Sequence, residues 1–274
     1  MSCGFGQIVV GPAGSGKSTY CHIMQDHGAL TRKVIKVCNL DPAADNFKYT
    51  WDIDVRDLIS LEDVMEELNL GPNGGLIYCM EYLLENMDWL HTELTEFADD
   101  SYILFDCPGQ IELYSHMTVM TKIVEQIKSW GYHLWAVFWC DATTCLSESG
   151  KFISTSLISL STMIQVQLPH LNIMTKCDMI QDKLTLKKAM DISLVEVAKD
   201  ENSSKFNQKY TGLNKMIAEV LEDFSLIRFV PLDIQNEESI DRVWSETDTL
   251  VQYKDFAMPD DAFYEEADRV QDDQ

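Results

Sequence analysis

Residues 11 to 19, directly after the apolar run 7–10, read Gly11-Pro12-Ala13-Gly14-Ser15-Gly16-Lys17-Ser18-Thr19. The stretch matches the pattern G-x-x-x-x-G-K-[ST], in which a strand leads through a phosphate-binding loop into a helix. Its glycines let the backbone turn N–H groups toward phosphate oxygens, and the start of the following helix adds positive potential. Because an amphipathic segment follows at 19–30, we predict a nucleoside triphosphate site rather than an unliganded glycine-rich turn.

The side chains of this loop have distinct predicted roles. The Lys17 ammonium is expected to reach the β- and γ-phosphates, and the Ser18 hydroxyl is expected to bind Mg²⁺. The predicted nucleotide contacts in the loop are Gly14, Ser15, Gly16, Lys17, Ser18 and Thr19.

Composition limits the other classes of function. The chain has 274 residues and a net charge of −24, with 45 acidic residues against 21 basic ones. Such an acidic surface repels nucleic acid and anionic membranes, so we expect neither as a direct partner. Eight scattered cysteines without a C-x-x-C pair, and the lack of a signal-peptide pattern, predict buried thiols in the reducing cytoplasm.

Apolar strand-like runs alternate with helical patterns along the chain. Strands are predicted at 7–10, 34–39, 102–106, 134–140, 171–175 and 226–230, and helices at 18–30, 60–68, 76–97, 115–130, 147–165, 209–224 and 238–253. This order predicts an α/β fold of the P-loop NTPase type, with a doubly wound, mostly parallel sheet and helices on both faces. Residues 1–254 are predicted to form this domain with a small polar helical insert at 181–208, and the acidic tail 255–274 to be disordered.

A second motif, Asp106-Cys107-Pro108-Gly109-Gln110, ends the predicted strand 102–106. An aspartate at the end of a strand can reach the coordination shell of Mg²⁺, so Asp106 is predicted as a metal residue beside Ser18. Gln110 and Glu112 are the candidates for holding the attacking water. The alternative is an ordinary turn at the end of a strand, and the presence of the phosphate loop in the same chain argues against it.

A third motif, Thr175-Lys176-Cys177-Asp178, follows the predicted strand 171–175 and resembles the guanine motif N-K-x-D. The Asp178 carboxylate can accept from both N1–H and the N2 amine of guanine, and Lys176 can lay its aliphatic stem on the base. Adenine lacks these two donors and would leave the carboxylate unpaired, so the motif favours GTP over ATP. Thr175 stands where asparagine is usual, which weakens the match.

The stretch Asn39-Leu40-Asp41-Pro42-Ala43 follows the second predicted strand, at the edge that also carries the phosphate loop. Asp41 is predicted to polarise the attacking water or to order Mg²⁺; it can also serve as a helix N-cap before Pro42. The acidic segment 52–54 is either a switch or a charged loop, and Arg56 beside it is interpreted as an ion-pair partner.

Between two predicted helices lies Gly71-Pro72-Asn73, which by itself predicts a tight turn. In order along the chain come the phosphate loop, Asn-Leu-Asp-Pro-Ala, Gly-Pro-Asn, Asp-Cys-Pro-Gly-Gln and Thr-Lys-x-Asp. This set resembles the GPN-loop GTPases over about residues 5–255, and segments 71–80, 103–114 and 151–158 look most like the third paralogous branch of that family.

The resemblance implies a dimer in which the Gly-Pro-Asn loop enters the nucleotide site of the partner. Gly71 and Pro72 would contact that site, and Asn73 would stabilise the transferred phosphoryl group in trans. Gly74 and Gly75 would permit close approach of the loop. It further implies Mg²⁺ and GTP/GDP as ligands, a homodimer or a heterodimer with another family member, and a role in assembly and nuclear import of RNA polymerase II, with shuttling to the nucleus.

Two other functions compete with GTP hydrolysis. The loop also resembles those of small-molecule kinases, but such enzymes need an arginine-rich lid and this chain has few arginines. A GTP-dependent scaffold or assembly module with negligible turnover would need the phosphate loop and the base motif, but not Asn73, Gln110 or Glu112. Their presence favours hydrolysis.

Overall fold

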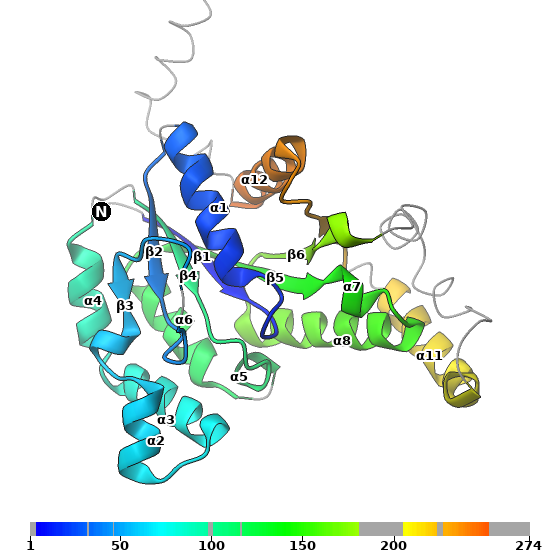
Figure 1. Cartoon of the computed structure of the whole chain (residues 1–274), viewed down its shortest axis with the longest axis horizontal. Coiled ribbons are helices and arrows are strands. Elements are labelled where there is room, and N and C mark those ends of the chain that lie inside the picture. The colour runs from blue at the N-terminus through cyan, green and yellow to red at the C-terminus, as the bar shows by residue number, and fades with distance from the viewer. Residues whose placement is uncertain are drawn as a thin grey trace, which may run out of the picture.

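A seven-stranded parallel sheet forms the centre of the computed structural model, which describes residues 4–31, 33–45, 47–97, 101–115, 117–180, 205–223 and 227–251. The strand order is β3-β2-β4-β1-β5-β6-β7, and every pairing is parallel. The strands are β1 (Phe5–Val10), β2 (Ile35–Asn39), β3 (Ile53–Asp54), β4 (Tyr102–Asp106), β5 (His133–Asp141), β6 (His170–Thr175) and β7 (Phe229–Pro231). The predicted α/β fold is confirmed (Figure 1).

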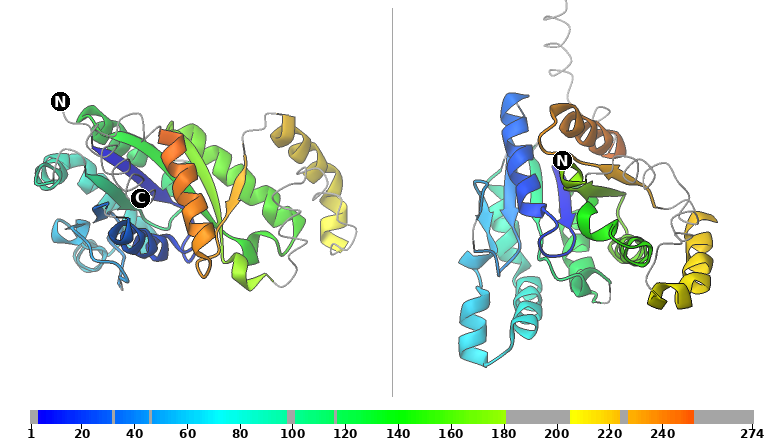
Figure 2. Two further views of the ribbon diagram at one scale, coloured as in Figure 1. Left: turned by 90° about the horizontal axis from the view of Figure 1, so that it is seen from above. Right: turned by 45° about the vertical axis from the view of Figure 1, so that its right-hand side comes forward.

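Helices cover both faces of the sheet because buried strands alternate their side chains between two cores. In β5, Phe138 joins one core and Trp139 joins the other. The first core also takes residues from α3 (Pro72–Glu85), α4 (Met87–Thr95), α5 (Glu112–Ser115), α6 (Val119–Ser129) and α8 (Ser149–Val166). The second takes residues from α1 (Lys17–Leu30) and α12 (Glu237–Val251), which lie together on the opposite face (Figure 2).

Five further elements lie around these layers. Helix α2 (Leu61–Leu68) packs on α3 at the bottom of Figure 1, and α11 (Lys205–Asp223) packs on α8 through a small cluster. Ser60 caps the N-terminus of α2, since the Asp63 N–H donates to Ser60 Oγ at 3.2 Å. Short turns of helix follow the ends of three strands: η1 (Val55–Asp57), α7 (Ala142–Cys145) and η2 (Cys177–Met179).

Several predicted boundaries are wrong, each for a local reason. The predicted helix 76–97 is two helices that meet at Asn86, whose side chain donates to the Tyr82 carbonyl at 2.8 Å. Helix α3 begins at Pro72 rather than at 76, because the fixed φ of proline suits the first position of a helix. Strand β3 was not predicted, since two residues are too few to show a pattern.

The predicted insert 181–208 lies outside the described residues up to 204, and its last four residues begin α11. The predicted tail 255–274 also lies outside them. In the part of the chain that the structure describes, no helix has the length and apolar character needed to cross a bilayer.

The register of the sheet gathers the motifs at one edge. Asp106 at the end of β4 is paired with Val9 of β1, just before the phosphate loop, and with Asn39 of β2. On the other side of β1, Asp141 of β5 is paired with Thr175 of β6. The carboxyl ends of parallel strands form the usual ligand crevice of such folds.

Candidate functional site

The phosphate loop joins β1 to α1 with the backbone geometry that its sequence predicts. Gly14 has φ of +74° and Gly16 has φ of +100°, a region that L-residues rarely adopt. Gly16 directly precedes the first residue of α1, so the loop ends on a helix N-terminus. This arrangement supplies the backbone N–H groups and the positive potential that an anion needs.

Lys17 places its charge inside the loop. Its Nζ donates to the Gly11 carbonyl at 3.0 Å and to the Pro12 carbonyl at 3.3 Å, and the residue is buried. These carbonyls hold the ammonium against the loop. The predicted nucleotide contacts from Gly14 to Thr19 therefore form one continuous group.

Asp106 is a buried carboxylate with an unused oxygen. The Tyr49 hydroxyl donates to its Oδ2 at 3.0 Å, whereas its buried Oδ1 has no hydrogen-bond partner. Burial raises the pKa of Asp106, against the nearby Ser18 hydroxyl and Lys17 ammonium, which lower it. A buried oxygen without a partner beside a hydroxyl fits the oxygen ligands that Mg²⁺ prefers.

Residues after β4 connect this carboxylate to the Gly-Pro-Asn segment. A Cβ on Gly109 would lie 2.9 Å from the Ala13 Cα, so this turn runs directly against the phosphate loop. The Gln110 Nε2 donates to the Asn73 Oδ1 at 2.7 Å, and both side chains lie at the surface. Two predicted catalytic residues, 37 positions apart, therefore touch within one chain. Glu112 is exposed at the start of α5.

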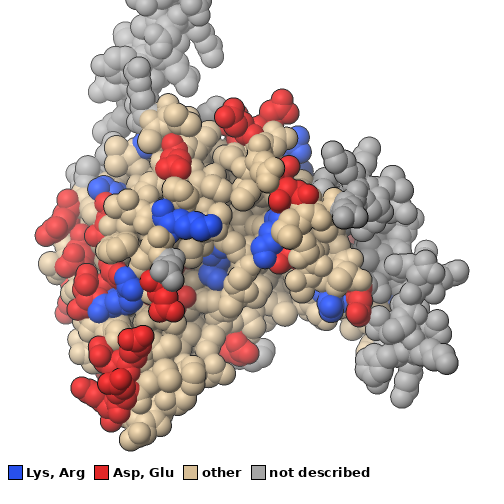
Figure 3. Space-filling model, viewed as in Figure 1, with Lys and Arg blue, Asp and Glu red and all other residues tan. Residues whose placement is uncertain are grey.

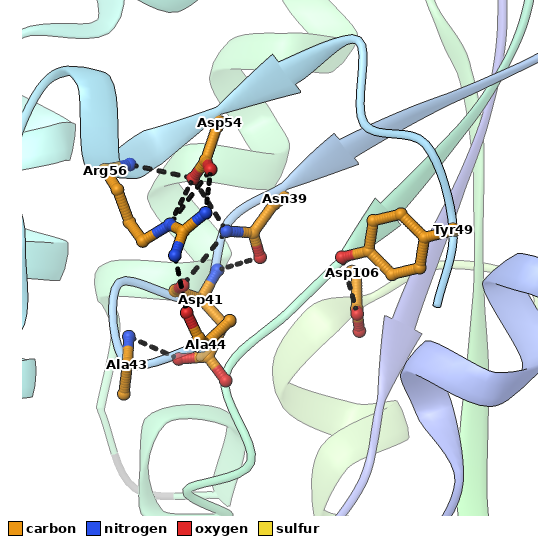
Figure 4. Close-up of polar contacts among 8 residues, drawn as sticks. All are labelled: Asn39, Asp41, Ala43, Ala44, Tyr49, Asp54, Arg56 and Asp106. Atoms are coloured by element: carbon orange, nitrogen blue, oxygen red, sulfur yellow. Dashed lines mark hydrogen bonds and ion pairs between the residues drawn. The ribbon is translucent and has the colours of Figure 1, made fainter. Parts of the chain in front are cut away.

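Asp41 sits at the start of a loop that a charged network holds in place (Figure 4). Its Oδ1 accepts from the Ala43 N–H at 3.0 Å, so it closes a turn and not a helix N-terminus. Burial raises the pKa of Asp41, although the Ala43 N–H and Lys17 lower it. Asp41 thus lies in the field of Lys17, close to the phosphate loop.

Behind this loop lies a network of three side chains. Asn39 Nδ2 donates to Asp54 Oδ1 at 2.9 Å, and Arg56 Nη2 lies 2.6 Å from Asp54 Oδ2. The guanidinium also donates to the Ala44 carbonyl at 2.8 Å. Burial alone would raise the pKa of Asp54, but the hydrogen bonds from Arg56 and Asn39 outweigh it and hold the pKa below its usual range. The interpretation of Arg56 as an ion-pair partner is confirmed.

The base motif is attached to the phosphate loop by its unusual threonine. The buried Thr175 Oγ1 lies 2.7 Å from the Ser15 carbonyl and 3.0 Å from the Cys140 carbonyl. Lys176 has φ of +57° and forms an ion pair with Asp141 at 2.6 Å. Asp178 is exposed in η2, beyond this pair.

The site brings most of the predicted residues together. The loop 14–19, Asp41, Asp106 and Thr175 meet at the sheet edge, and Asn73 reaches Gln110. Gly71 and Pro72 are exposed at the start of α3. Gly75 is buried within the chain, where a Cβ would meet Leu61 at 2.8 Å, so its missing side chain gives α2 room to pack on α3.

Sequence reasoning missed three partners of the site residues. Asp141 ends a strand at the functional edge, and that position alone could have identified it. Asp54 was noticed only as part of an acidic segment. Tyr49 comes from an irregular loop, 57 positions before Asp106, and carries no sequence signal.

Comparisons with known proteins agree with this arrangement. Residues 9–253 match the model of a family described as "Conserved hypothetical ATP binding protein". Proteins named GPN-loop GTPase 3 are 43% identical in Dictyostelium discoideum, over 92% of this chain and 89% of that protein, and 44% identical in Danio rerio, over 91% and 88%.

A solved structure, a GTPase in apo form from Pyrococcus abyssi, is similar with a TM-score of 0.70 at 21% identity. The match covers 88% of this chain and 95% of that one. At this level of identity the likeness concerns the fold.

Proposed function

This chain belongs to the GPN-loop GTPase family, and from that premise we propose that it binds GTP with Mg²⁺ and hydrolyses it to GDP and phosphate as a dimer. The observation that carries the proposal is the buried Asp106 Oδ1, which lacks a hydrogen-bond partner beside Ser18 and the phosphate loop. A buried carboxylate oxygen without a hydrogen bond costs free energy, and an ordinary structural turn would not require it.

In this proposal the phosphate loop binds the triphosphate and two side chains hold the metal. Backbone N–H groups of residues 14–19 and the Lys17 ammonium compensate the phosphate charge. Ser18 and Asp106 would hold Mg²⁺, which would supply positive charge to offset that of the triphosphate. Because the whole chain carries −24, these local cations are needed to hold an anionic ligand.

Three polar side chains are proposed to handle the attacking water. Gln110 and Glu112 follow the turn that lies against the phosphate loop, and Asp41 lies in the field of Lys17. A positioned amide orients water without taking its proton, whereas a carboxylate can also accept one. Burial raises the pKa of Asp41, which makes its carboxylate a stronger base than that of an exposed aspartate.

Asn73 is proposed to stabilise the phosphoryl group in the site of the partner. Its exposed position at the start of α3 leaves it accessible to a second chain. The hydrogen bond from Gln110 to Asn73 favours a second version, in which Asn73 orients Gln110 within its own chain. The two versions differ in whether one chain alone completes the site.

Guanine selectivity is proposed to come from Asp178, which can accept from both N1–H and the N2 amine. The ion pair between Lys176 and Asp141 fixes the turn that presents Asp178. The bond from Thr175 to the Ser15 carbonyl fixes the distance between this turn and the phosphate loop. The guanine base and the phosphates of one nucleotide can then be bound at a fixed distance from each other.

The cellular role is proposed from family membership alone. We infer a cytoplasmic protein that shuttles to the nucleus and acts in assembly and import of RNA polymerase II, paired with itself or with another GPN-loop GTPase. Asp and Glu gather in the region of α2 at the lower left of Figure 3, and residues 57–121 contain no lysine or arginine. This charge favours protein partners over nucleic acid.

Hydrolysis measured per subunit over a wide range of protein concentration tests the proposal. We expect Mg²⁺-dependent turnover of GTP but not ATP, and a specific activity that rises with concentration. Asp106→Asn should lower the turnover and raise the Mg²⁺ concentration that hydrolysis needs. GTP binding with no turnover at any concentration would contradict hydrolysis by this chain alone and favour the scaffold alternative.

A further inference from the structure

A groove with a volume of about 500 Å³ lies between helix α2 and the loop that follows Asp41. The loop segment 42–45 lines it, together with Leu61 and Met65 of α2, with Trp51 and with the short helix η1. We call this the α2 groove. The proposed hydrolysis gives it no task, because the predicted nucleotide contacts lie in the phosphate loop and the base motif.

The lining of the α2 groove is negatively charged. Four carboxylates line it, those of Asp45, Asp54, Asp57 and Glu62, against the single guanidinium of Arg56. Arg56 already pairs with the buried Asp54, at 2.6 Å. The other three carboxylates are exposed, and within the described part of the chain they form no ion pair. The groove therefore attracts a cationic occupant and repels an anionic one.

Trp51 adds an aromatic surface to the groove. Its ring centroid lies 4.9 Å from that of Phe47 and 5.9 Å from the Arg56 Cζ, yet 46% of the residue is exposed. An exposed indole beside carboxylates suits the long stem and charged head of a lysine or arginine. Among the described residues, no group of His, Cys, Asp or Glu is arranged to hold a metal ion, so an organic cation fits better.

The negative surface continues along α2 beyond the groove. Glu66 lies one helical turn after Glu62, and Glu67 lies one turn after Asp63, so each pair shares a face of the helix. Figure 3 shows Asp and Glu gathered in this region. A single small cation leaves most of these charges unpaired, whereas an extended chain with several cations can pair with them in sequence.

We propose that the α2 groove docks a basic segment of a partner protein, in which lysine or arginine alternates with apolar residues. An extended segment turns alternate side chains to opposite sides. Its cationic heads pair with Asp45, Asp57 and Glu62, and its apolar side chains and stems pack on Trp51 and α2. This docking does not depend on nucleotide hydrolysis.

Charge decides what kind of molecule the partner is. Nucleic acid and anionic membranes carry the same sign of charge as the groove and are repelled. A second copy of this chain is a poor source of cations, since each copy carries a net charge of −24. The occupant is therefore a basic segment of a different protein.

Fluorescence anisotropy with the full-length, nucleotide-free chain tests the docking. The probe is a short labelled peptide that alternates arginine and leucine. We expect saturable binding that weakens as salt is added, because the carboxylates are exposed. A peptide with citrulline in place of arginine keeps the shape but loses the charge, and should bind at least about tenfold more weakly. Spermine in excess should not displace the arginine peptide.

Paired variants locate the binding surface. Asp45→Asn combined with Glu62→Gln should weaken peptide binding at least about tenfold. Glu237→Gln combined with Glu238→Gln removes the same charge from two exposed residues at the start of α12, which lies far from α2 in Figure 1, and should leave the affinity unchanged. Trp51→Ala should weaken binding without a change of charge; if that variant does not fold, the two exposed acidic pairs still decide.

Four results would overturn the proposal. They are no binding of the arginine peptide to the wild type, equal binding of the citrulline peptide, displacement by spermine, and equal affinity in the wild type and the variant at 45 and 62. Equal losses in both acidic pairs would likewise show attraction to the net charge rather than to the groove. Because no nucleotide is present, a chain that fails to bind GTP would contradict the proposed function and leave this test intact.

Discussion

At the scale of single residues, Gly109 shows how the site depends on close backbone contact. A Cβ at this position would lie 2.9 Å from the Ala13 Cα and 3.0 Å from its N and Cβ. Real Cβ atoms do not approach backbone so closely, so a side chain there must move the phosphate loop. The turn that contains Gly109 therefore packs directly against the phosphate loop.

Gly109→Ala should therefore weaken GTP binding by about tenfold or more, because the loop is displaced from its phosphate-binding geometry. Titration with a fluorescent GTP analogue measures this loss. Gly212→Ala is the matched control, since no atom lies within 4 Å of its added Cβ. Equal affinity in both variants would show that the loop tolerates the displacement.

At the scale of elements, two adjacent glycines of α3 have opposite surroundings. A Cβ on Gly75 would meet Leu61 at 2.8 Å and Met65 at 3.3 Å, both from α2. A Cβ on Gly74 would meet its nearest neighbours, two atoms of Leu70, at 4.0 Å. Of these two glycines, Gly75 is the one that faces α2 and gives it room to pack on α3.

Gly74→Ala should stabilise the protein by up to about 0.5–1 kcal/mol, because alanine loses less backbone entropy in a helix. Gly75→Ala should instead destabilise it by about 1–3 kcal/mol through overpacking. Urea unfolding of the two variants measures the difference. A stabilising effect of Gly75→Ala would mean that α2 shifts freely on α3.

The network of Asn39, Asp54 and Arg56 also acts at the scale of elements, because it fixes the loop that carries Asp41. The pKa of Asp54 is lowered in the folded chain, so its stabilising contribution is complete above the unfolded value of ~3.9. The contribution is lost as the pH falls below that value and through the folded pKa. The network therefore strengthens the fold at neutral pH and not in strong acid.

Asp54→Asn should lower the free energy of unfolding by about 2 kcal/mol at pH 7, since it removes charged hydrogen bonds from Arg56. The difference from wild type should shrink below about pH 4. Denaturant unfolding at a series of pH values measures it, and the exposed Asp57→Asn serves as control. A difference that does not change with pH would contradict a charged Asp54 in the folded state.

At the scale of the whole molecule, the sequence correctly predicted that the site residues at the ends of strands lie close together. The phosphate loop and Asp41 follow strands, and Asp106 and Thr175 end strands; a parallel sheet places all such ends at one edge. The contacts between loops were not predictable in this way. Tyr49 reaches Asp106, and Asn73 reaches Gln110, through irregular segments whose course depends on packing.

Helix ends were predicted least well, for a physical reason. Apolar residues recur at helical spacing on both sides of Asn86, so the sequence pattern continues although one helix ends there and another begins. A turn was predicted for the Gly-Pro-Asn segment because glycine and proline are typical of turns. In the structure these residues start α3, where proline is favoured.

The dimeric site is the central proposal at this scale, and a mixing experiment tests it most directly. Asn73→Ala retains its phosphate loop, and Lys17→Ala retains Asn73; each should be inactive alone. If Asn73 acts in trans, an equal mixture should regain about a quarter of the wild-type rate, because half of random dimers are mixed and each has one complete site. Co-purification of differently tagged chains confirms mixing. Confirmed mixed dimers without recovered GTP hydrolysis would contradict the trans role and leave Asn73 acting on Gln110 of its own chain.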